Sequence, residues 1–463
     1  LLLGFTSGQV AAGGVAFAAA VGTLSTWGWR GLLVVSPLLA VIVATGFVPV
    51  AGRTAVDWIP VVRHYAARRR AGQLEFRRRV GQVRKAGVLA LPGDAAATRL
   101  HVTADGTAML LDPHAQTLTA VVAIKHPAFV LLDSTEQEQR AMGWATGLAG
   151  YCQSGRHIAR VQIMERTVPA SAVATRSYWD AAGVHDGSWA HRSYEQLIAT
   201  ARPDALAHQS LVALTLDVKA AGRVARGLGR GLDGWAAMLR QRMDGLHRYL
   251  ANARMEPMGW LGADALVALV RSAYDPASTQ HLDAHRQVGR SAGVAGPVAV
   301  TERWNHLVSD SAYHAVLMVN EWPRVRVEPG FLWPLILSSG VQRTFSLVLS
   351  PQPTQKAIRE AQSERVQYQT DRNQRAKAGM IDSFAHAAEQ AEVEQREAEL
   401  VAGHGSMQYV GLIVVSATSL ESLDADVEQI RDAAATCNVD VVRLYGEQAQ
   451  GFVAGALPLG RGL

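Results

Sequence analysis

The sequence predicts an α+β protein. We expect an N-terminal two-helix transmembrane hairpin, followed by cytoplasmic mixed α/β domains with antiparallel sheets and a long helical arm. Three observations predict this fold class. The first 52 residues contain one charged side chain, Arg30, and the next 33 residues carry ten lysines and arginines against two acidic residues. Segments with alternating strand-like and helix-like periodicity then follow.

Two apolar segments, residues 9–27 and 32–50, are long enough to cross a bilayer, because a spanning helix needs about 20 residues. The short connection between them predicts an antiparallel hairpin over residues 1–52. The basic excess after Gly52 is typical of a segment that stays in the cytoplasm. We therefore expect a multi-pass protein of the cell (inner) membrane with both ends and the bulk of the chain cytoplasmic. A cleaved signal peptide and a buried core helix are the alternatives for the first and second segments.

Residues 53–86 are expected to form a basic juxtamembrane helix, because Thr54 and Asp57 have the spacing of a helix start. Near anionic lipid each basic charge contributes about 1 kcal/mol. The arginines predicted to lie on the membrane surface are Arg53, Arg63, Arg68, Arg69, Arg70, Arg77, Arg78 and Arg79.

The charge distribution disfavours a nucleic-acid-binding body. The whole chain carries +5, of which Arg30 contributes +1 and residues 53–85 contribute +8, so the remainder carries −4. Stacking aromatics are also nearly absent from the basic run. We expect no direct sequence-specific contact with nucleic acid.

The remaining chain predicts several domains. Residues 100–102 and 108–111 flank an Asp105-Gly106 turn and predict a β-hairpin. Ser134 begins a predicted helix, and residues 193–208 predict another. The expected order is a cytoplasmic α+β domain (87–275), a linker (276–296), the first part of a second α+β domain (297–352), a helical arm (353–403) that could mediate oligomer contact, and a terminal βαβ unit (404–463).

Motifs for catalysis are absent or weak. The sequence has no G-x-x-x-x-G-K-[ST] phosphate-binding loop. Gly229 to Gly234 match G-x-G-x-x-G but stand inside a helical stretch, without the strand that a dinucleotide site needs. We predict no enzyme activity, no cofactor and no catalytic or metal-binding residues.

Other candidate residues have ordinary structural explanations. His281 and His285 have the i, i+4 spacing of a metal pair but lack a third ligand. Cys152 and Cys437 are expected to be small buried residues in a reducing compartment. A run of carboxylates is interpreted as a solvated helix face, and its members are Glu392, Glu394, Glu397 and Glu399.

Three segments resemble known families. "LLVVSPLLAVIVATGFVPVAGRTAVDWIPVVRHYAARRR" resembles the two-helix membrane subunit of conjugative type IV secretion systems. "SDSAYHAVLMVNEWPRVRVEPGFLWPLILSSGVQRTFSLVLSPQP" and the last 50 or so residues resemble the N-terminal, non-motor region of VirB-type conjugation ATPases. The matching residues include Trp322, Pro323, Phe331, Leu332, Arg343 and the element Leu457-Pro458-Leu459-Gly460. The whole is also similar to actinobacterial conjugation-associated integral membrane proteins.

The resemblance implies a function. In the ATPase family the Leu-Pro-Leu-Gly element precedes a RecA-like motor, whose P-loop this sequence lacks. We expect a membrane-anchored structural component of a type IV secretion-like or conjugative DNA-transfer machine, with a motor ATPase on a separate chain. Other membrane secretion subunits, anionic lipid and further copies of the chain are the other expected partners. A membrane subunit of a type VII system and an enzyme with an unrecognised site are the alternatives.

Overall fold

A computed structural model of the chain contains two compact units. The helical unit comprises residues 1–73 and 366–388, and the sheet unit comprises residues 74–365 and 389–463. The structure describes residues 7–47, 49–79, 85–125, 129–153, 157–170, 172–200, 206–279, 282, 291–323, 325, 327–337, 340–377, 395, 397–400 and 404–462.

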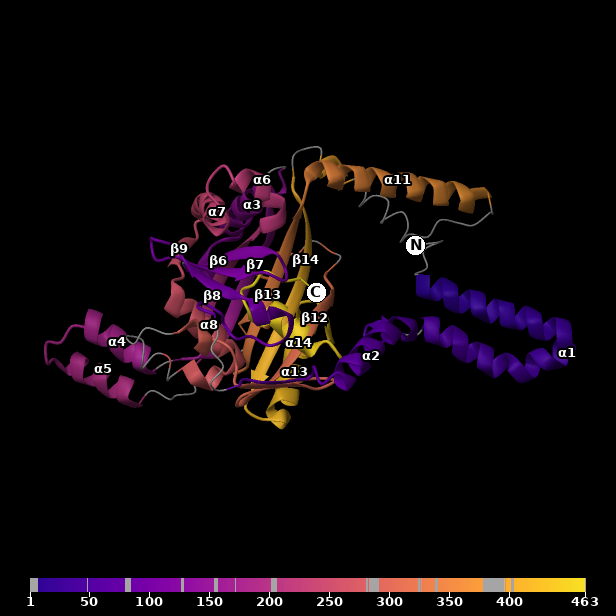
Figure 1. Ribbon diagram of the computed structural model, residues 1–463, viewed down its shortest axis with the longest axis horizontal. Helices are drawn as coiled ribbons and strands as arrows, with labels where there is room; N and C mark the ends of the chain where they lie inside the picture. The colour runs from indigo at the N-terminus through magenta and orange to yellow at the C-terminus, as the bar shows by residue number, and fades with distance from the viewer. Residues whose placement is uncertain are drawn as a thin grey trace. The chain divides into compact units, whose positions relative to one another are not determined.

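The helical unit contains α1 (Ser7–Phe47), α2 (Ala55–Arg70) and two short paired strands, β1 (Pro49–Val50) and β2 (Arg53–Thr54). α1 leaves helical conformation at Gly28, where φ is 63° and ψ is −163°, and the chain reverses direction there (Figure 1). The predicted start of α2 is confirmed, because the Thr54 hydroxyl accepts a hydrogen bond from the backbone N–H of Asp57 at 3.4 Å.

The predicted transmembrane hairpin is wrong. Among the described residues, no helix has both the length and the apolar composition that crossing a membrane requires. The assignment to the cell (inner) membrane as a multi-pass protein with both ends cytoplasmic is wrong for the same reason. A stretch with a single charge, here Arg30, need not be strongly apolar: glycine, serine and threonine interrupt the apolar side chains of α1, and Gly28 divides it into two shorter arms.

One large antiparallel sheet organises the sheet unit. Its order is β3-β10-β11-β12-β14-β13-β7-β8-β6-β5-β4, with β15 also paired to β12 and β9 to β6. The strands are β3 (Glu75–Arg77), β4 (Arg99–Val102), β5 (Ala108–Asp112), β6 (Thr117–Lys125), β7 (Ile158–Pro169), β8 (Leu206–Asp217), β9 (Glu256–Trp260), β10 (Ala299–Glu302), β11 (Leu307–Ser309), β12 (Ala312–Glu321), β13 (Gln342–Gln352), β14 (Ser406–Ala417) and β15 (Asp440–Arg443).

Helices cover both faces of this sheet, with α3, α6 and α7 grouped together in Figure 1. The helices are α3 (Ser134–Ala149), α4 (Ala172–Ala182), α5 (Trp189–Thr200), α6 (Val218–Ala225), α7 (Leu232–Asn252), α8 (Ala263–Tyr274), α10 (Trp333–Ile336), α11 (Thr354–Lys377), α13 (Leu420–Thr436) and α14 (Gln448–Ala456). The 3-10 turns are η1 (Gly93–Ala97), η2 (Phe129–Leu131), η3 (Gly150–Cys152), η4 (Pro276–Ser278) and η5 (Ala292–Val294).

The local prediction that rested on a turn motif is confirmed. The hairpin at residues 100–111 is confirmed as β4 and β5, which pair antiparallel. β14, α13 and β15 form the terminal βαβ arrangement, with β12 paired between the two strands. Both predicted α+β domains contribute strands to one continuous sheet.

Two predicted helices end early. The basic helix expected over residues 53–86 ends at Arg70, and Glu75–Arg77 pair with β10 as strand β3. The helix expected over residues 193–208 ends at Thr200, because residues from Leu206 onward continue the long ladder between β7 and β8.

The sheet must be strongly curved. One edge of the sheet is β3, which pairs with β10. At the other edge, beyond β4, the backbone N–H of Leu89 donates to the Thr98 carbonyl. About eleven strand spacings separate these two edges, which would be about 53 Å in a flat sheet. Arg78 and Gly87 at those edges are nine residues apart, which the chain spans in at most about 32 Å. The edges therefore approach each other, and the sheet bends around its inner face.

The described residues form three large apolar cores on the sheet and one small cluster of Ala357, Ala361 and Leu400 beside it. The inner core lies on the face covered by α8 and α14 and includes Met164, Leu412 and Phe452. On the other face, the first outer core packs α6 and α7 on β6 and β8, and the second outer core packs α13 on β12 and β14. The sheet is thus covered on both faces over its central strands.

Phe452 is a direct test of the inner core. Its ring is fully buried and lies 4.8 Å, centroid to centroid, from the rings of both Tyr274 and His314. We expect Phe452→Ala to lower the free energy of unfolding by about 3–5 kcal/mol through lost burial and a residual cavity. Urea denaturation measures this. Tyr178→Ala, at a side chain that is 75% exposed, should change it by less than about 0.5 kcal/mol, and equal effects would contradict the assignment.

His314 is a buried polar group in the same core. Its Nδ1 lies 2.8 Å from the Ser416 hydroxyl and its Nε2 lies 3.2 Å from the Tyr274 carbonyl. A carbonyl only accepts, so Nε2 carries the proton and Nδ1 accepts from Ser416. Burial lowers the pKa of His314 to about 4, although nearby Asp275 and Asp310 oppose this shift.

We therefore expect a pH-dependent loss of stability. The unfolded imidazole binds a proton below about pH 6.5, whereas the folded one does so only near pH 4. The stability that depends on neutral His314 is complete above pH 6.5 and is lost as the pH falls toward 4, by about 3 kcal/mol. Urea denaturation between pH 7 and 4.5 should show a shallower decline in His314→Gln than in the wild type. Parallel curves would contradict this explanation.

Candidate functional site

The Leu-Pro-Leu-Gly element is the most tightly held segment that the resemblance singled out. Residues 457–460, here called the C-terminal latch, follow α14 and are all buried against the sheet. The side chain of Gln162 on β7 lies beneath them with no exposed surface. Its Nε2 donates to the carbonyls of Ala454 (3.0 Å) and Leu457 (3.1 Å), and its Oε1 accepts from the N–H of Gly460 at 2.9 Å.

Gly460 passes too close to the sheet for any other residue. Its φ is +58°, in the left-handed region, and an added Cβ would collide with the Thr215 hydroxyl. Thr215 shares a 3.0 Å hydrogen bond with Thr119, whose hydroxyl lies 3.4 Å from the Leu459 carbonyl. The threonine pair and Gly460 therefore fix the depth at which the latch lies.

Two arginines fix the direction in which the chain leaves the latch. Arg160 donates to the Gly460 carbonyl at 2.9 Å, and burial, aided by the positive charge of Arg461, lowers the pKa of Arg160. Arg461 itself forms an ion pair with Asp112, at 2.6 Å from Nη2 and 2.7 Å from Nε. It also donates to the Asp94 carbonyl at 3.1 Å.

Asp112 is a buried carboxylate whose two oxygens have separate partners. Oδ2 accepts from the Arg461 guanidinium, and Oδ1 accepts from the backbone N–H groups of His114 and Ala115 at 3.0 and 3.1 Å. The same carboxylate thus shapes the turn after β5 and anchors the chain at the latch exit. A buried charge needs such pairing, since an unpaired one would cost several kcal/mol.

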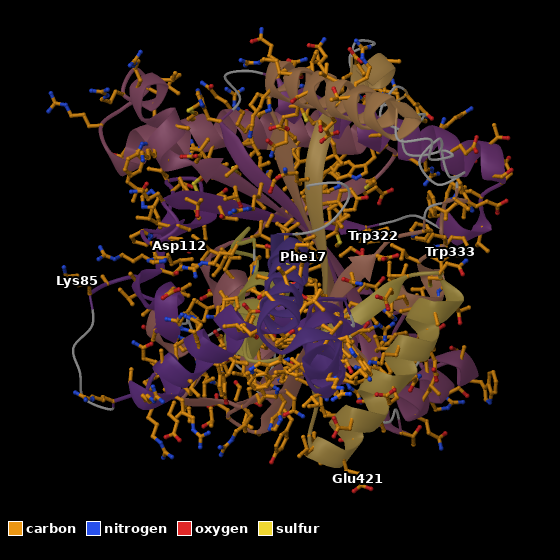
Figure 2. All side chains as sticks on the ribbon, turned by 90° about the vertical axis from the view of Figure 1, so that its right-hand side faces the viewer. Phe17, Lys85, Asp112, Trp322, Trp333 and Glu421 are labelled. Carbon is orange, nitrogen blue, oxygen red and sulfur yellow. The ribbon has the colours of Figure 1, made fainter. Side chains whose placement is uncertain are left out.

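The other residues of the resemblance lie elsewhere on the sheet. Trp322, Phe331 and Leu332 pack against the second outer core. Figure 2 shows Trp322 and Trp333 on the side of the view opposite to Asp112. Arg343 donates to the carbonyls of Val341, at 3.0 Å, and Ile336, and burial lowers its pKa to about 10. These residues support the connection between β12 and β13 and do not line the latch.

The eight predicted surface arginines are divided between the two units. Five belong to β2 and α2 of the helical unit, namely Arg53, Arg63, Arg68, Arg69 and Arg70. Arg77 to Arg79 belong to the sheet unit, where Arg78 donates to the Gly293 carbonyl at 3.0 Å. The helix predicted to carry all of them ends at Arg70, and their contact with anionic lipid stays a prediction.

The G-x-G-x-x-G match has a structural role. Gly231 has a φ of +57° and precedes α7, and Gly234 approaches the carbonyls of Ala225 and Gly229 too closely for a side chain. The glycines therefore allow α6 and α7 to meet at a tight turn. A strand leading directly into a phosphate-binding helix is absent from this described stretch, because α6 precedes the glycines.

The remaining candidates carry no site in the part of the chain that the structure describes. Within it, no group of three or more His, Cys, Asp or Glu residues could hold a metal ion. His281, His285, Glu392 and Glu394 lie outside the described residues. Glu397 accepts from Arg365 at 2.8 Å. Cys152 and Cys437 are buried free thiols whose pKa values are raised by burial.

The comparison with known proteins adds no family. No protein-family model matches the chain, and no curated protein sequence matches it. The latch therefore has to be judged on its own geometry. Gln162, Arg160 and Asp112, which hold it, were not singled out from the sequence. Their one sequence signal is that polar residues stand at buried or half-buried positions of β5 and β7.

Gly460 provides a test of the latch with a matched control. Gly460→Ala should lower the free energy of unfolding by about 2 kcal/mol or more, because the residue is left-handed and a Cβ collides with Thr215. Gly462→Ala should have little effect, since its Cβ would meet the Arg160 side chain at an unstrained 3.4 Å. Chemical denaturation of both variants measures the two free energies of unfolding. Equal stabilities would show that the latch is not held at this depth.

Proposed function

We propose that the chain is a non-enzymatic structural component of a type IV secretion-like or conjugative DNA-transfer machine, which docks a P-loop motor ATPase carried on a separate chain. The observation that carries the proposal is the rigid C-terminal latch. In the family that this chain resembles, the matching element leads into the motor domain. An element held by Gln162, Arg160 and Arg461 gives a fixed place at which such a motor can be positioned.

The chemistry within residues 1–463 fits a docking role. The 463-residue sequence has no P-loop, and its one glycine-rich match serves the turn between α6 and α7. Nucleotide hydrolysis needs a phosphate cradle with a lysine and a magnesium-binding hydroxyl. A chain without these groups can still control a motor by fixing its position and orientation.

The surface around the latch exit is the docking surface that we propose for the motor. It carries Asp94 and His114, whose side chains are 68% and 64% exposed and lie 3.9 Å apart, beside Arg461. Charges at the rim of an interface mainly govern partner selection and association rate. Reversing this exposed pair should therefore weaken docking without unfolding the chain.

The test is affinity purification of the tagged full chain from its native host after mild cross-linking. We expect recovery of an ATPase that has a P-loop and a RecA-like motor sequence. The double variant Asp94→Lys with His114→Glu should reduce its recovery at least tenfold.

The matched control is Glu428→Lys with Arg431→Glu, which reverses an ion pair 2.6 Å apart on α13 between an exposed glutamate and a half-buried arginine. It should leave recovery unchanged. The proposal fails if no P-loop ATPase is recovered, or if both double variants reduce its recovery equally. ATP hydrolysis by the purified chain alone would also contradict it.

A further inference from the structure

The order of elements in the sheet unit repeats. Apart from three additional helices, α4 and α5 between β7 and β8 and α6 between β8 and α7, strands β4, β5 and β6 are followed by α3, β7, β8, α7, β9 and α8. Strands β10, β11 and β12 are followed by α10, β13, β14, α13, β15 and α14. We call these the first repeat (β4 to α8) and the second repeat (β10 to α14). An order of nine elements shared twice is too long to arise from the general preference for short connections between neighbours.

The strand pairing repeats as well. β6 pairs with β5, β8 and β9, and β12 pairs with β11, β14 and β15. β7 pairs with β8 as β13 pairs with β14. Even single backbone hydrogen bonds correspond. The Leu261 N–H donates to the Val121 carbonyl at 2.8 Å, and the Leu444 N–H donates to the Val316 carbonyl at 2.9 Å. Each donor directly follows the last strand of its repeat, β9 or β15.

The two repeats meet symmetrically through β7 and β13. These strands pair antiparallel, with Met164 opposite Ser346 and three further pairs on each side. Gln162 also donates to the Ser346 hydroxyl at 2.8 Å across this seam. An antiparallel contact between equivalent strands is the geometry of a two-fold, isologous interface. A local two-fold axis therefore passes near Met164 and Ser346.

Each repeat holds the end of the other. The latch, which ends the second repeat, lies over the hydrogen-bonded pair Thr119 and Thr215 of β6 and β8. The corresponding pair in the second repeat is His314 and Ser416, which are likewise opposite each other on β12 and β14. The end of α8 lies over that pair, where the Tyr274 carbonyl lies 3.2 Å from His314 Nε2.

We infer that the sheet unit is an internal duplication, folded as a fused two-fold dimer in which each repeat is completed by the end of the other. The interaction surface is the β7–β13 seam together with the two exchanged ends, and the partner of each repeat is the other repeat of the same chain. Each exchanged end also fixes the point at which the chain leaves its repeat. The end of α8 leads to the second repeat, and the latch occupies the equivalent position at the end of the second repeat.

The insertions fit this scheme. α4 and α5 lie between β7 and β8, and α11 begins the connection between β13 and β14, which is the same joint of each repeat. Because β7 and β13 run antiparallel, these joints lie at opposite ends of the sheet, as Figure 1 shows. The helical insertions are therefore separate additions to one shared core.

The test is to cut the folded full chain between the repeats. A site for a specific protease is placed within residues 283–288, and the purified protein is cleaved to completion. We expect the uncut protein to unfold at the wild-type midpoint. After cleavage the two fragments should co-elute at the volume of the uncut chain and separate only on dilution or in denaturant.

Variants at the two exchanged ends make the test specific. Gln162→Ala and His314→Ala each remove a contact between the repeats and should each raise the dissociation constant of the cut fragments at least tenfold. Gln241→Ala, at an exposed glutamine of α7, and Val427→Ala, inside the second outer core alone, should not. Separate elution of the fragments, a change of the uncut protein on insertion of the site, or an effect at only one of the two ends would overturn the inference.

Discussion

The side chain of Gln162 is the interaction on which the sheet unit depends. It is fully buried, and all of its side-chain hydrogen bonds join β7 to parts of the chain nearly 200 residues or more away: Ser346 on β13, α14 and the C-terminal latch. A buried amide that lost these partners would cost about 1–3 kcal/mol for each unsatisfied group. The same side chain therefore sets the seam between the repeats and the position of the latch. The inner core forms around that contact.

Local signals in the sequence predicted local structure well. The Asp105-Gly106 turn predicted the β4–β5 hairpin, and the change of periodicity after residue 404 predicted the terminal strands and helix. Strand order could not be predicted in this way, because the pairing of β7 with β13 joins residues far apart in the sequence. The near absence of charge before Arg53 led to the wrong transmembrane prediction, since low charge and a strongly apolar composition are different properties.

The candidate site was predictable only in part. The Leu-Pro-Leu-Gly element drew attention through its resemblance, but the residues that hold it are scattered over β5, β6, β7 and β8. Asp112 and Arg160 look like ordinary surface charges in the sequence, but in the fold Asp112 pairs with Arg461 and Arg160 donates to Gly460. The repeat also explains the latch, because the first repeat ends in an equivalent contact over His314. The structural role that we propose, positioning a motor, needs such a fixed exit.

Native-state hydrogen exchange at the latch tests the central claim most directly. Leu459 N–H donates to the Leu457 carbonyl at 2.9 Å, and Gly460 N–H donates to Gln162. If the latch is part of the inner core, both amides should exchange only through global unfolding, as slowly as the amides of β8 and β14. Exchange at the rate of an exposed tail, while those strands stay protected, would contradict the account.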